Sequence, residues 1–191
     1  MKYSKENELF PQIPRSGTGI YSSLSLRQLQ VAELAACGYS NREIASELKD
    51  DFPVVLAVMG GAAVFTGHLL PLLDFPLEFG AIEVTRYGNT TQGREITWRL
   101  APKDNVKGRI VLVVDDILDE GITLSAIHEK LKEMGAKKVY SAVFADKDLG
   151  RKKPIDAEFV GVTVPNRYVF GYGMDYHEQG RNLPAIWAVD A

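Results

Sequence analysis

The chain has 191 residues, of which 46% are hydrophobic and 25% charged, and its net charge is −3. These globular proportions exclude a disordered or collagen-like chain, and no run of about 18 apolar residues could span a membrane. The slightly acidic balance argues against a nucleic-acid coat, which needs clustered Lys and Arg. One cysteine and a polar start without an apolar signal segment favour a cytoplasmic protein.

The first fifty residues differ in texture from the rest, although the length predicts effectively one domain at about 150 residues per domain. Residues 1–20 are polar and contain prolines and glycines, which indicates an arm. Residues 25–50 have helical apolar spacing, broken at Gly38. Cys37 lies in this apolar stripe and is expected to pack rather than to react. We therefore separate residues 1–50 from residues 51–191.

After Pro53 the pattern alternates between strands and helices. Strands are predicted at 54–59, 82–87, 95–100, 110–114, 138–144 and 158–162. Helices are predicted through Phe65 and Leu69 and from about 123 to 134. The runs 54–59 and 110–114 are fully apolar, which is typical of strands buried on both faces. This alternation predicts an α/β fold with a parallel sheet flanked by helices. The polar residues 88–93 are expected to form a loop.

The segment from 110 to 123 carries the most chemistry. After its apolar strand come Asp115, Asp116, Asp119, Gly121 and Thr123, in that order. Ligands of open α/β folds bind at the carboxyl ends of strands, and free N–H groups at a following helix N-terminus can hold a phosphate. Carboxylates beside such a cradle suit sugar hydroxyls or magnesium. The segment predicts a phosphorylated sugar ligand with a divalent cation; the alternative is an acidic loop that only caps the helix.

The same segment resembles the phosphoribosyl-pyrophosphate signature of type I phosphoribosyltransferases: four apolar residues, two acids, two apolar residues, then Asp, a variable position, Gly and Thr. From about Asp51 onward the chain resembles the hypoxanthine-guanine phosphoribosyltransferase branch. The resemblance implies a parallel-sheet core with a small hood, built from C-terminal elements and partly from residues 1–50. It also implies Mg²⁺-dependent conversion of hypoxanthine or guanine and phosphoribosyl pyrophosphate to IMP or GMP and pyrophosphate, in a homodimer or homotetramer.

The resemblance implies roles for individual residues on the phosphoribose side. Asp115 and Asp116 would hold the ribose 2′- and 3′-hydroxyls, directly or through Mg²⁺, and Asp119 would be the catalytic base that takes the purine N7 proton. The remaining phosphoribosyl-pyrophosphate contacts would be Glu120, Gly121, Ile122 and Thr123 around the 5′-phosphate, Met59, Gly60 and Gly61 in the pyrophosphate loop, Arg181 at the pyrophosphate, and Asp175 as a metal ligand.

On the purine side, the resemblance implies that Lys147 contacts the 6-oxo group, Tyr168 stacks on the base and the Val169 backbone reads its edge. A flexible loop of Arg86, Tyr87, Gly88 and Asn89 would close over the reaction. Since adenine has no 6-oxo acceptor, such a lysine would discriminate against it. Two positions depart from the family pattern: Met59 stands where several relatives have lysine, and Ile122 where a polar residue is frequent.

Several of these residues have a structural interpretation as well. Taken alone, Lys147 belongs to the charged run 147–153, which would be a solvated surface. Tyr168 would be a core aromatic, and Asp175 a turn residue. The three histidines, His68, His128 and His177, lack metal-ligand spacing and are expected to be structural or surface residues.

Three further functions stay open. One is a relative that prefers xanthine, and another is a non-catalytic regulator that binds phosphoribosyl pyrophosphate or nucleotide, although a regulator has no need of Asp119. The third is DNA binding, because residues 24–48 resemble the first part of a LuxR-type helix-turn-helix. In that motif the recognition helix comes next, whereas here the strand at 54–59 follows. A nucleic-acid partner is therefore not expected.

Overall fold

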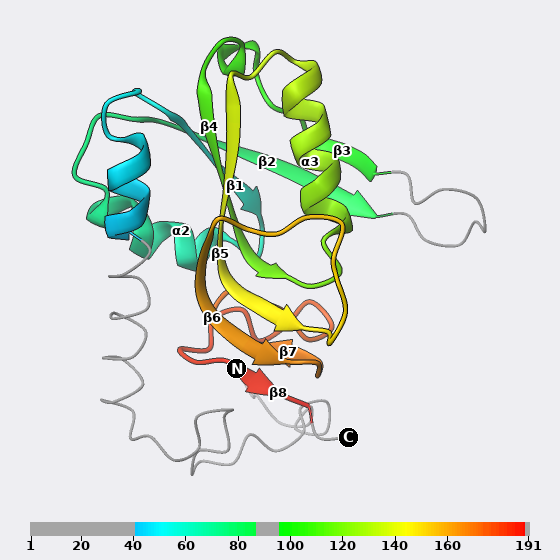
Figure 1. The fold of residues 1–191 in the computed structure, drawn as a ribbon. Coiled ribbons are helices and arrows are strands. Elements are labelled where there is room, and N and C mark those ends of the chain that lie inside the picture. Colours follow the sequence, from blue (N-terminus) through cyan, green and yellow to red (C-terminus); the bar gives the residue numbers. More distant parts are fainter. Residues whose placement is uncertain (1–40, 87–95, 190–191) are drawn as a thin grey trace, which may run out of the picture.

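A six-stranded sheet forms the centre of the computed structural model, which describes residues 41–86 and 96–189 (Figure 1). Its strands are β1 (Val54–Met59), β2 (Glu78–Arg86), β3 (Ile96–Leu100), β4 (Ile110–Leu118), β5 (Lys138–Asp148) and β6 (Phe159–Pro165). They lie in the order β3-β2-β1-β4-β5-β6, and all neighbours are parallel except β2 and β3. The predicted α/β fold is confirmed. The edge pair is antiparallel because only residues 87–95 connect its strands, too few for a crossover.

Four strands are longer than predicted, among them β6, which continues to Pro165. β2 begins at Glu78 rather than at 82, β4 continues to Leu118 and β5 to Asp148. The predicted end of β4 at 114 is wrong, because Asp115 and Asp116 lie within that strand. The pairing with β5 continues through Asp115 to the end of β4, because strand pairing needs backbone groups and not apolar side chains.

Helices cover both faces of the sheet (Figure 1). On one face lie the helix of residues 41–48 and α2 (Ala63–Leu69), followed by the short helix η1 (Leu70–Leu72); on the other lies α3 (Ile122–Glu133). Alternate residues of β4 divide between the faces, since Leu112 and Val114 pack with the first group and Val111 and Val113 with α3. This period of two on a strand buried on both sides explains the continuous apolar run.

The helix of residues 41–48 belongs to the core. Ile44 and Leu48 are fully buried, and Glu47 accepts a hydrogen bond from the Tyr140 hydroxyl on β5 at 3.1 Å. The rest of the helix-turn-helix-like stretch, with Cys37 and Gly38, lies outside the described residues. Among the helices that the structure describes, none is long and apolar enough to cross a membrane.

The chain beyond β6 forms a second, two-stranded sheet of β7 (Val169–Phe170) and β8 (Trp187–Ala188), which pair antiparallel. That these C-terminal elements form a small hood stays a prediction. Since residues 1–40 lie outside the described chain, their share in the hood and the division at residue 50 stay predictions. A further short helix, η2 (Asp104–Val106), precedes β4.

Two of the three histidines have hydrogen-bonding partners inside the fold. His68 pairs through Nδ1 with the Tyr172 hydroxyl, and His128 Nε2 lies 2.5 Å from the Ser141 hydroxyl. His177 is exposed. In the described part of the chain, no three His, Cys, Asp or Glu residues are grouped to hold a metal ion.

We expect His128 to make folding sensitive to acid. Burial, and next the charge of Lys132, lowers the pKa of His128 to about 4 from its usual 6.5. Below pH 6.5 the unfolded chain therefore binds a proton that the folded chain rejects, and by pH 5 the free energy of unfolding falls by about 2 kcal/mol. His128→Gln should flatten this slope in urea titrations between pH 7 and pH 5. Exposed His177→Asn should keep it, and equal slopes in all three proteins would refute the prediction.

Candidate functional site

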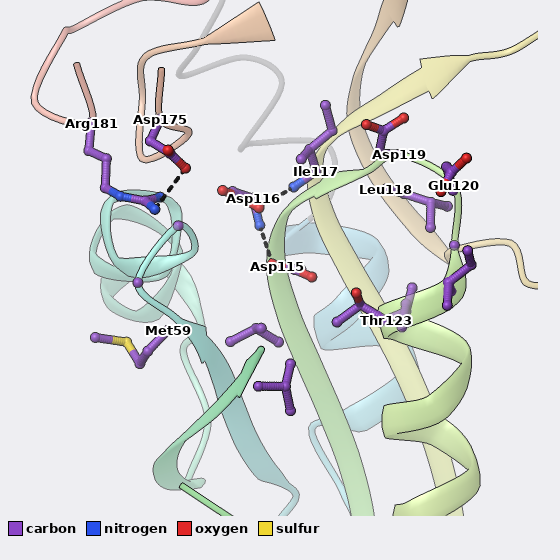
Figure 2. A pocket seen from close by; sticks show the side chains of 17 residues that line it. Met59, Asp115, Asp116, Ile117, Leu118, Asp119, Glu120, Thr123, Asp175 and Arg181 are labelled. Atoms are coloured by element: carbon purple, nitrogen blue, oxygen red, sulfur yellow. Dashed lines mark hydrogen bonds and ion pairs between the residues drawn. The ribbon is translucent and has the colours of Figure 1, made fainter. Parts of the chain in front are cut away.

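Two carboxylates lie side by side near the end of β4. Asp115 is 9% exposed, and its Oδ1 accepts a hydrogen bond from the Asp116 backbone N–H at 2.9 Å. Asp116 Oδ1 accepts one from the backbone N–H of Ile117 at 2.7 Å. The two carboxylates are close enough for each to influence the pKa of the other. Both line one pocket at the carboxyl ends of the strands (Figure 2).

The electrostatics of this pair call for a cationic or hydroxyl-bearing ligand. Burial, and next the charge of Asp116, raises the pKa of Asp115 well above its usual value. Burial also raises the pKa of Asp116, against smaller opposing effects of its hydrogen bonds and the charge of Arg181. Desolvated neighbouring carboxylates oppose ionisation unless a cation or strong donors compensate them. The free protein holds this arrangement at a cost in stability.

Asp115→Asn should therefore stabilise the fold and weaken the site. We expect the free energy of unfolding at pH 7 to rise by about 1 kcal/mol, because the variant removes a buried charge and keeps the shape. Because the pKa of Asp115 is raised in the folded state, the ionised Asp115 of the wild type opposes folding at pH values above that pKa. The stability advantage of Asp115→Asn should therefore shrink as the pH falls toward 4. Urea unfolding measures both effects. Lower stability of the variant at pH 7 would contradict them.

The turn after β4 leads into α3 through Gly121. This glycine is the N-cap of α3 with φ +80°, a left-handed conformation that residues with a Cβ rarely adopt. Thr123, at the start of α3, lines the pocket with its side chain (Figure 2). Glu120 and Ile122 line it as well. A helix of this length with free N–H groups at its start can bind a phosphate.

The loop after β1 closes another side of the same pocket. Met59, Gly60 and Gly61 all line it, and the Met59–Gly60 peptide is cis. A Cβ at Gly61 would lie 1.7 Å from Asp116 Oδ2, so a side chain there would displace that carboxylate. The loop and the carboxylate pair are thus fitted to each other.

Arg181 and Asp175 come from the C-terminal segment. Arg181 donates through Nη1 to the Gly173 carbonyl at 2.7 Å and through Nη2 to Asp175 Oδ1 at 2.8 Å. Asp175 Oδ2 accepts from the backbone N–H of Glu178 at 2.9 Å. Figure 2 shows the Asp116 side chain directed toward the side of the pocket that holds both residues. The structure therefore brings the Arg181 guanidinium into one cavity with five carboxylate residues, namely Asp115, Asp116, Asp119, Glu120 and Asp175.

A second pocket adjoins the first, and Asp119 and Glu120 line both. Here Lys147 Nζ lies 2.7 Å from Asp119 Oδ2. Lys147 is 8% exposed and lies within β5 rather than just after it. The interpretation of the run 147–153 as solvated surface is thus wrong at this residue, because the end of a long strand carries it into the pocket.

Tyr168 lines the second pocket and Val169 does not. Tyr168 is 53% exposed, which excludes the core interpretation, and its hydroxyl donates to the Asp175 carbonyl at 3.1 Å. Burial of its hydroxyl end raises the pKa of Tyr168. Val169 is 6% exposed in β7. Of the loop 86–89, only the Arg86 backbone, at the end of β2, falls within the described residues.

Sequence reasoning missed Lys153 and Tyr172. Lys153 Nζ donates to the Leu118 carbonyl at 2.7 Å. Tyr172 stacks on Phe144 at 4.2 Å between ring centroids and bonds to His68. Lys153 is the other buried lysine of the charged run, and nothing in its spacing separates it from exposed Lys152. Only its contacts identify it.

Comparisons with known proteins all match this chain to phosphoribosyltransferases. A model of the phosphoribosyl transferase domain matches residues 28–177. The hypoxanthine-guanine phosphoribosyltransferase of Bacillus subtilis (strain 168) is 39% identical over 160 residues, covering 83% of this chain and 86% of that protein. The hypoxanthine-guanine-xanthine phosphoribosyltransferase of Tritrichomonas foetus is 40% identical, covering 76% of this chain and 82% of that protein.

Solved structures agree with these sequence matches. A hypoxanthine phosphoribosyltransferase from Staphylococcus aureus superposes with a TM-score of 0.76 at 28% identity, covering 83% of this chain and 87% of that one. The domain match includes residues 28–48, so the helix-turn-helix-like stretch falls largely within the same domain. On the motif, the fold and these relatives together, the chain belongs to the phosphoribosyltransferase family, in its hypoxanthine-guanine branch.

Proposed function

We propose that the protein is a purine-salvage phosphoribosyltransferase. It converts hypoxanthine or guanine and phosphoribosyl pyrophosphate to IMP or GMP and pyrophosphate. One observation carries this proposal: Asp119 lines both adjoining pockets, one with a phosphate-binding helix start and a carboxylate pair, the other with Lys147 and Tyr168. Asp119 therefore lies where a purine in the second pocket would meet the ribose C1′ of a ligand in the first.

The bond changes assign a task to each pocket. Purine N9 attacks C1′ while the C1′–oxygen bond to pyrophosphate breaks, and its electron pair leaves with pyrophosphate. Asp119 takes the N7 proton of the purine as N9 becomes bonded. The developing charge at C1′ is oxocarbenium-like, as in glycoside hydrolysis. Arg181, close to the Met59–Gly61 loop in the same pocket, supplies a cation for the departing pyrophosphate.

The residues present fit Mg²⁺. Asp115 and Asp116 offer carboxylate oxygens whose burial raises their pKa values, and Asp175 brings another carboxylate to the lining of the same pocket. Magnesium in such sites is typically bound by one or two carboxylates together with substrate oxygens, so a preformed protein cage is not required. When bound, Mg²⁺ would neutralise charge on the pyrophosphate. Asp115 and Asp116 also orient the ribose hydroxyls.

Lys147 is proposed to select 6-oxopurines. Its ammonium, held beside Asp119, donates to the 6-oxo oxygen, whereas the 6-amino group of adenine offers no acceptor. Lys147→Met should raise the KM for hypoxanthine about 10–100-fold, the effect of losing a charged hydrogen bond. Steady-state kinetics with exposed Lys152→Met as the matched control measures this. A variant with unchanged KM would remove the lysine from purine recognition.

The function is tested by nucleotide formation from phosphoribosyl pyrophosphate and Mg²⁺, with hypoxanthine, guanine, xanthine, adenine and uracil in parallel. We expect turnover with hypoxanthine or guanine and none with adenine or uracil. The Tritrichomonas foetus relative is named for xanthine as well, so preference for xanthine is the second candidate. Tight phosphoribosyl pyrophosphate binding without turnover of any base would instead support the regulator. Cytoplasmic location and a homodimer or homotetramer stay predictions.

A further inference from the structure

Lys153 lies between β5 and β6 and is buried, with 8% of its surface exposed. Its Nζ donates to the Leu118 carbonyl oxygen at 2.7 Å and forms an ion pair with the Asp146 carboxylate. Since a buried ammonium needs partners for its donors, these two contacts fix where the side chain can lie.

The two partners of Lys153 are themselves neighbours. Leu118 and Asp146 are register partners at the carboxyl ends of β4 and β5. The residues that follow them are Asp119 and Lys147, whose side chains pair at 2.7 Å. The Lys153 ammonium thus contacts both Leu118 and Asp146, the residues that immediately precede Asp119 and Lys147.

The segment around Lys153 packs against the same turn. A Cβ at Gly121 would lie 3.2 Å from Pro154 Cδ and 3.4 Å from Ile155 Cγ2. Arg151 and Glu120 add an ion pair at 3.7 Å. Residues 151–155 therefore contact the turn 118–121 both before and after Asp119, which limits its freedom to move.

Stability alone does not explain a buried lysine here. Buried ion pairs contribute little net stability, and apolar replacements of similar volume are often neutral or better. An apolar side chain, however, would leave the Leu118 carbonyl without this donor. We propose that Lys153 is a positioning residue, which fixes Asp119 and Lys147 relative to each other so that both meet the purine correctly. This inference rests on the proposed function.

The test compares Lys153→Met with Lys152→Met, a matched change at the exposed neighbour. We expect kcat/KM for hypoxanthine to fall about 10–100-fold in Lys153→Met, because small displacements of reacting groups are costly. Phosphoribosyl pyrophosphate affinity, measured by equilibrium binding, should change by less than about twofold, since Lys153 does not line that pocket. Lys152→Met should match the wild type in both.

Two further measurements separate positioning from folding. The double variant Lys153→Met, Asp146→Asn removes the unpaired carboxylate; its urea midpoint should return toward wild type while kcat/KM stays low. Amide hydrogen exchange in the peptide 115–123 should quicken in both variants and not in Lys152→Met. Recovery of kcat/KM in the double variant, or wild-type exchange and kinetics in Lys153→Met, would overturn the proposal.

Failure of the proposed function would look different. A wild-type protein that forms no nucleotide from any purine refutes the function itself, whatever the variants do. Hydrogen exchange needs no turnover, so it still decides whether Lys153 holds the turn 118–121: faster exchange supports that hold, and unchanged exchange overturns it.

Discussion

Asp119→Asn is expected to lower kcat for hypoxanthine by about 10²–10⁴-fold, the range for loss of a positioned general base. Asparagine keeps the shape and can still accept from Lys147, but it cannot take the N7 proton. The phosphoribose contacts proposed for Asp115 and Asp116 remain. Phosphoribosyl pyrophosphate affinity should therefore change by less than about threefold. Steady-state kinetics and equilibrium binding of phosphoribosyl pyrophosphate measure the two quantities.

The matched control for this change is Asp148→Asn. Asp148 also lies beside Lys147, but it is exposed and accepts a hydrogen bond only from the Gly150 backbone among the described contacts, a role that asparagine can keep. Its kcat should equal that of the wild type. If Asp119→Asn retained most of the activity, Asp119 would not be the general base.

Gly173→Ala is expected to destabilise the protein by about 2–5 kcal/mol, from backbone strain and overpacking together. Gly173 has φ +102°, and a Cβ there would lie 2.0 Å from the Gly61 carbonyl oxygen. The clash is with backbone, so no side-chain rotation relieves it. Because Gly61 borders Asp116 and Gly173 accepts from Arg181, phosphoribosyl pyrophosphate affinity should fall as well.

Gly67→Ala provides the comparison for this second change. Gly67 is exposed in α2, and a Cβ there meets nothing within 4 Å. Alanine favours a helix interior over glycine, so the free energy of unfolding should rise by about 0.5–1 kcal/mol. Urea unfolding and phosphoribosyl pyrophosphate titration test both variants. Wild-type stability and affinity in Gly173→Ala would show that the C-terminal segment yields easily at this contact.

Much of the fold could be predicted from local patterns. The apolar runs at 54–59 and 110–114 mark the two central strands of the sheet, and the helix from 122 to 133 begins and ends within a residue of its prediction. These elements can be predicted because a strand buried on both faces is a continuous apolar run, and a helix buried on one face has apolar residues at helical spacing. Strand ends were less readable, since β4 and β5 continue by backbone pairing into polar residues.

The motif chemistry was also local. Two acids after a buried strand, then Asp, Gly and Thr before a helix, indicate a sugar-phosphate site because the strand end and the helix start must lie close together. The glycine at 121 fits this interpretation, with its positive φ at the N-cap of α3. The sequence by itself therefore determined the α/β sheet and the part of the first pocket that residues 115–123 supply.

Tertiary structure decided which distant residues complete the site. Lys153 is buried, while its neighbour Lys152 is exposed, because the chain after β5 brings Lys153 to the Leu118 carbonyl. The close approach of Gly173 to Gly61 spans more than a hundred residues. Such contacts carry no periodic signal, because a lysine in a charged run or a glycine in a loop looks the same whether it faces solvent or a backbone carbonyl. Only contacts between distant segments distinguish them, such as those of Lys153 with Leu118 and of Gly173 with Gly61.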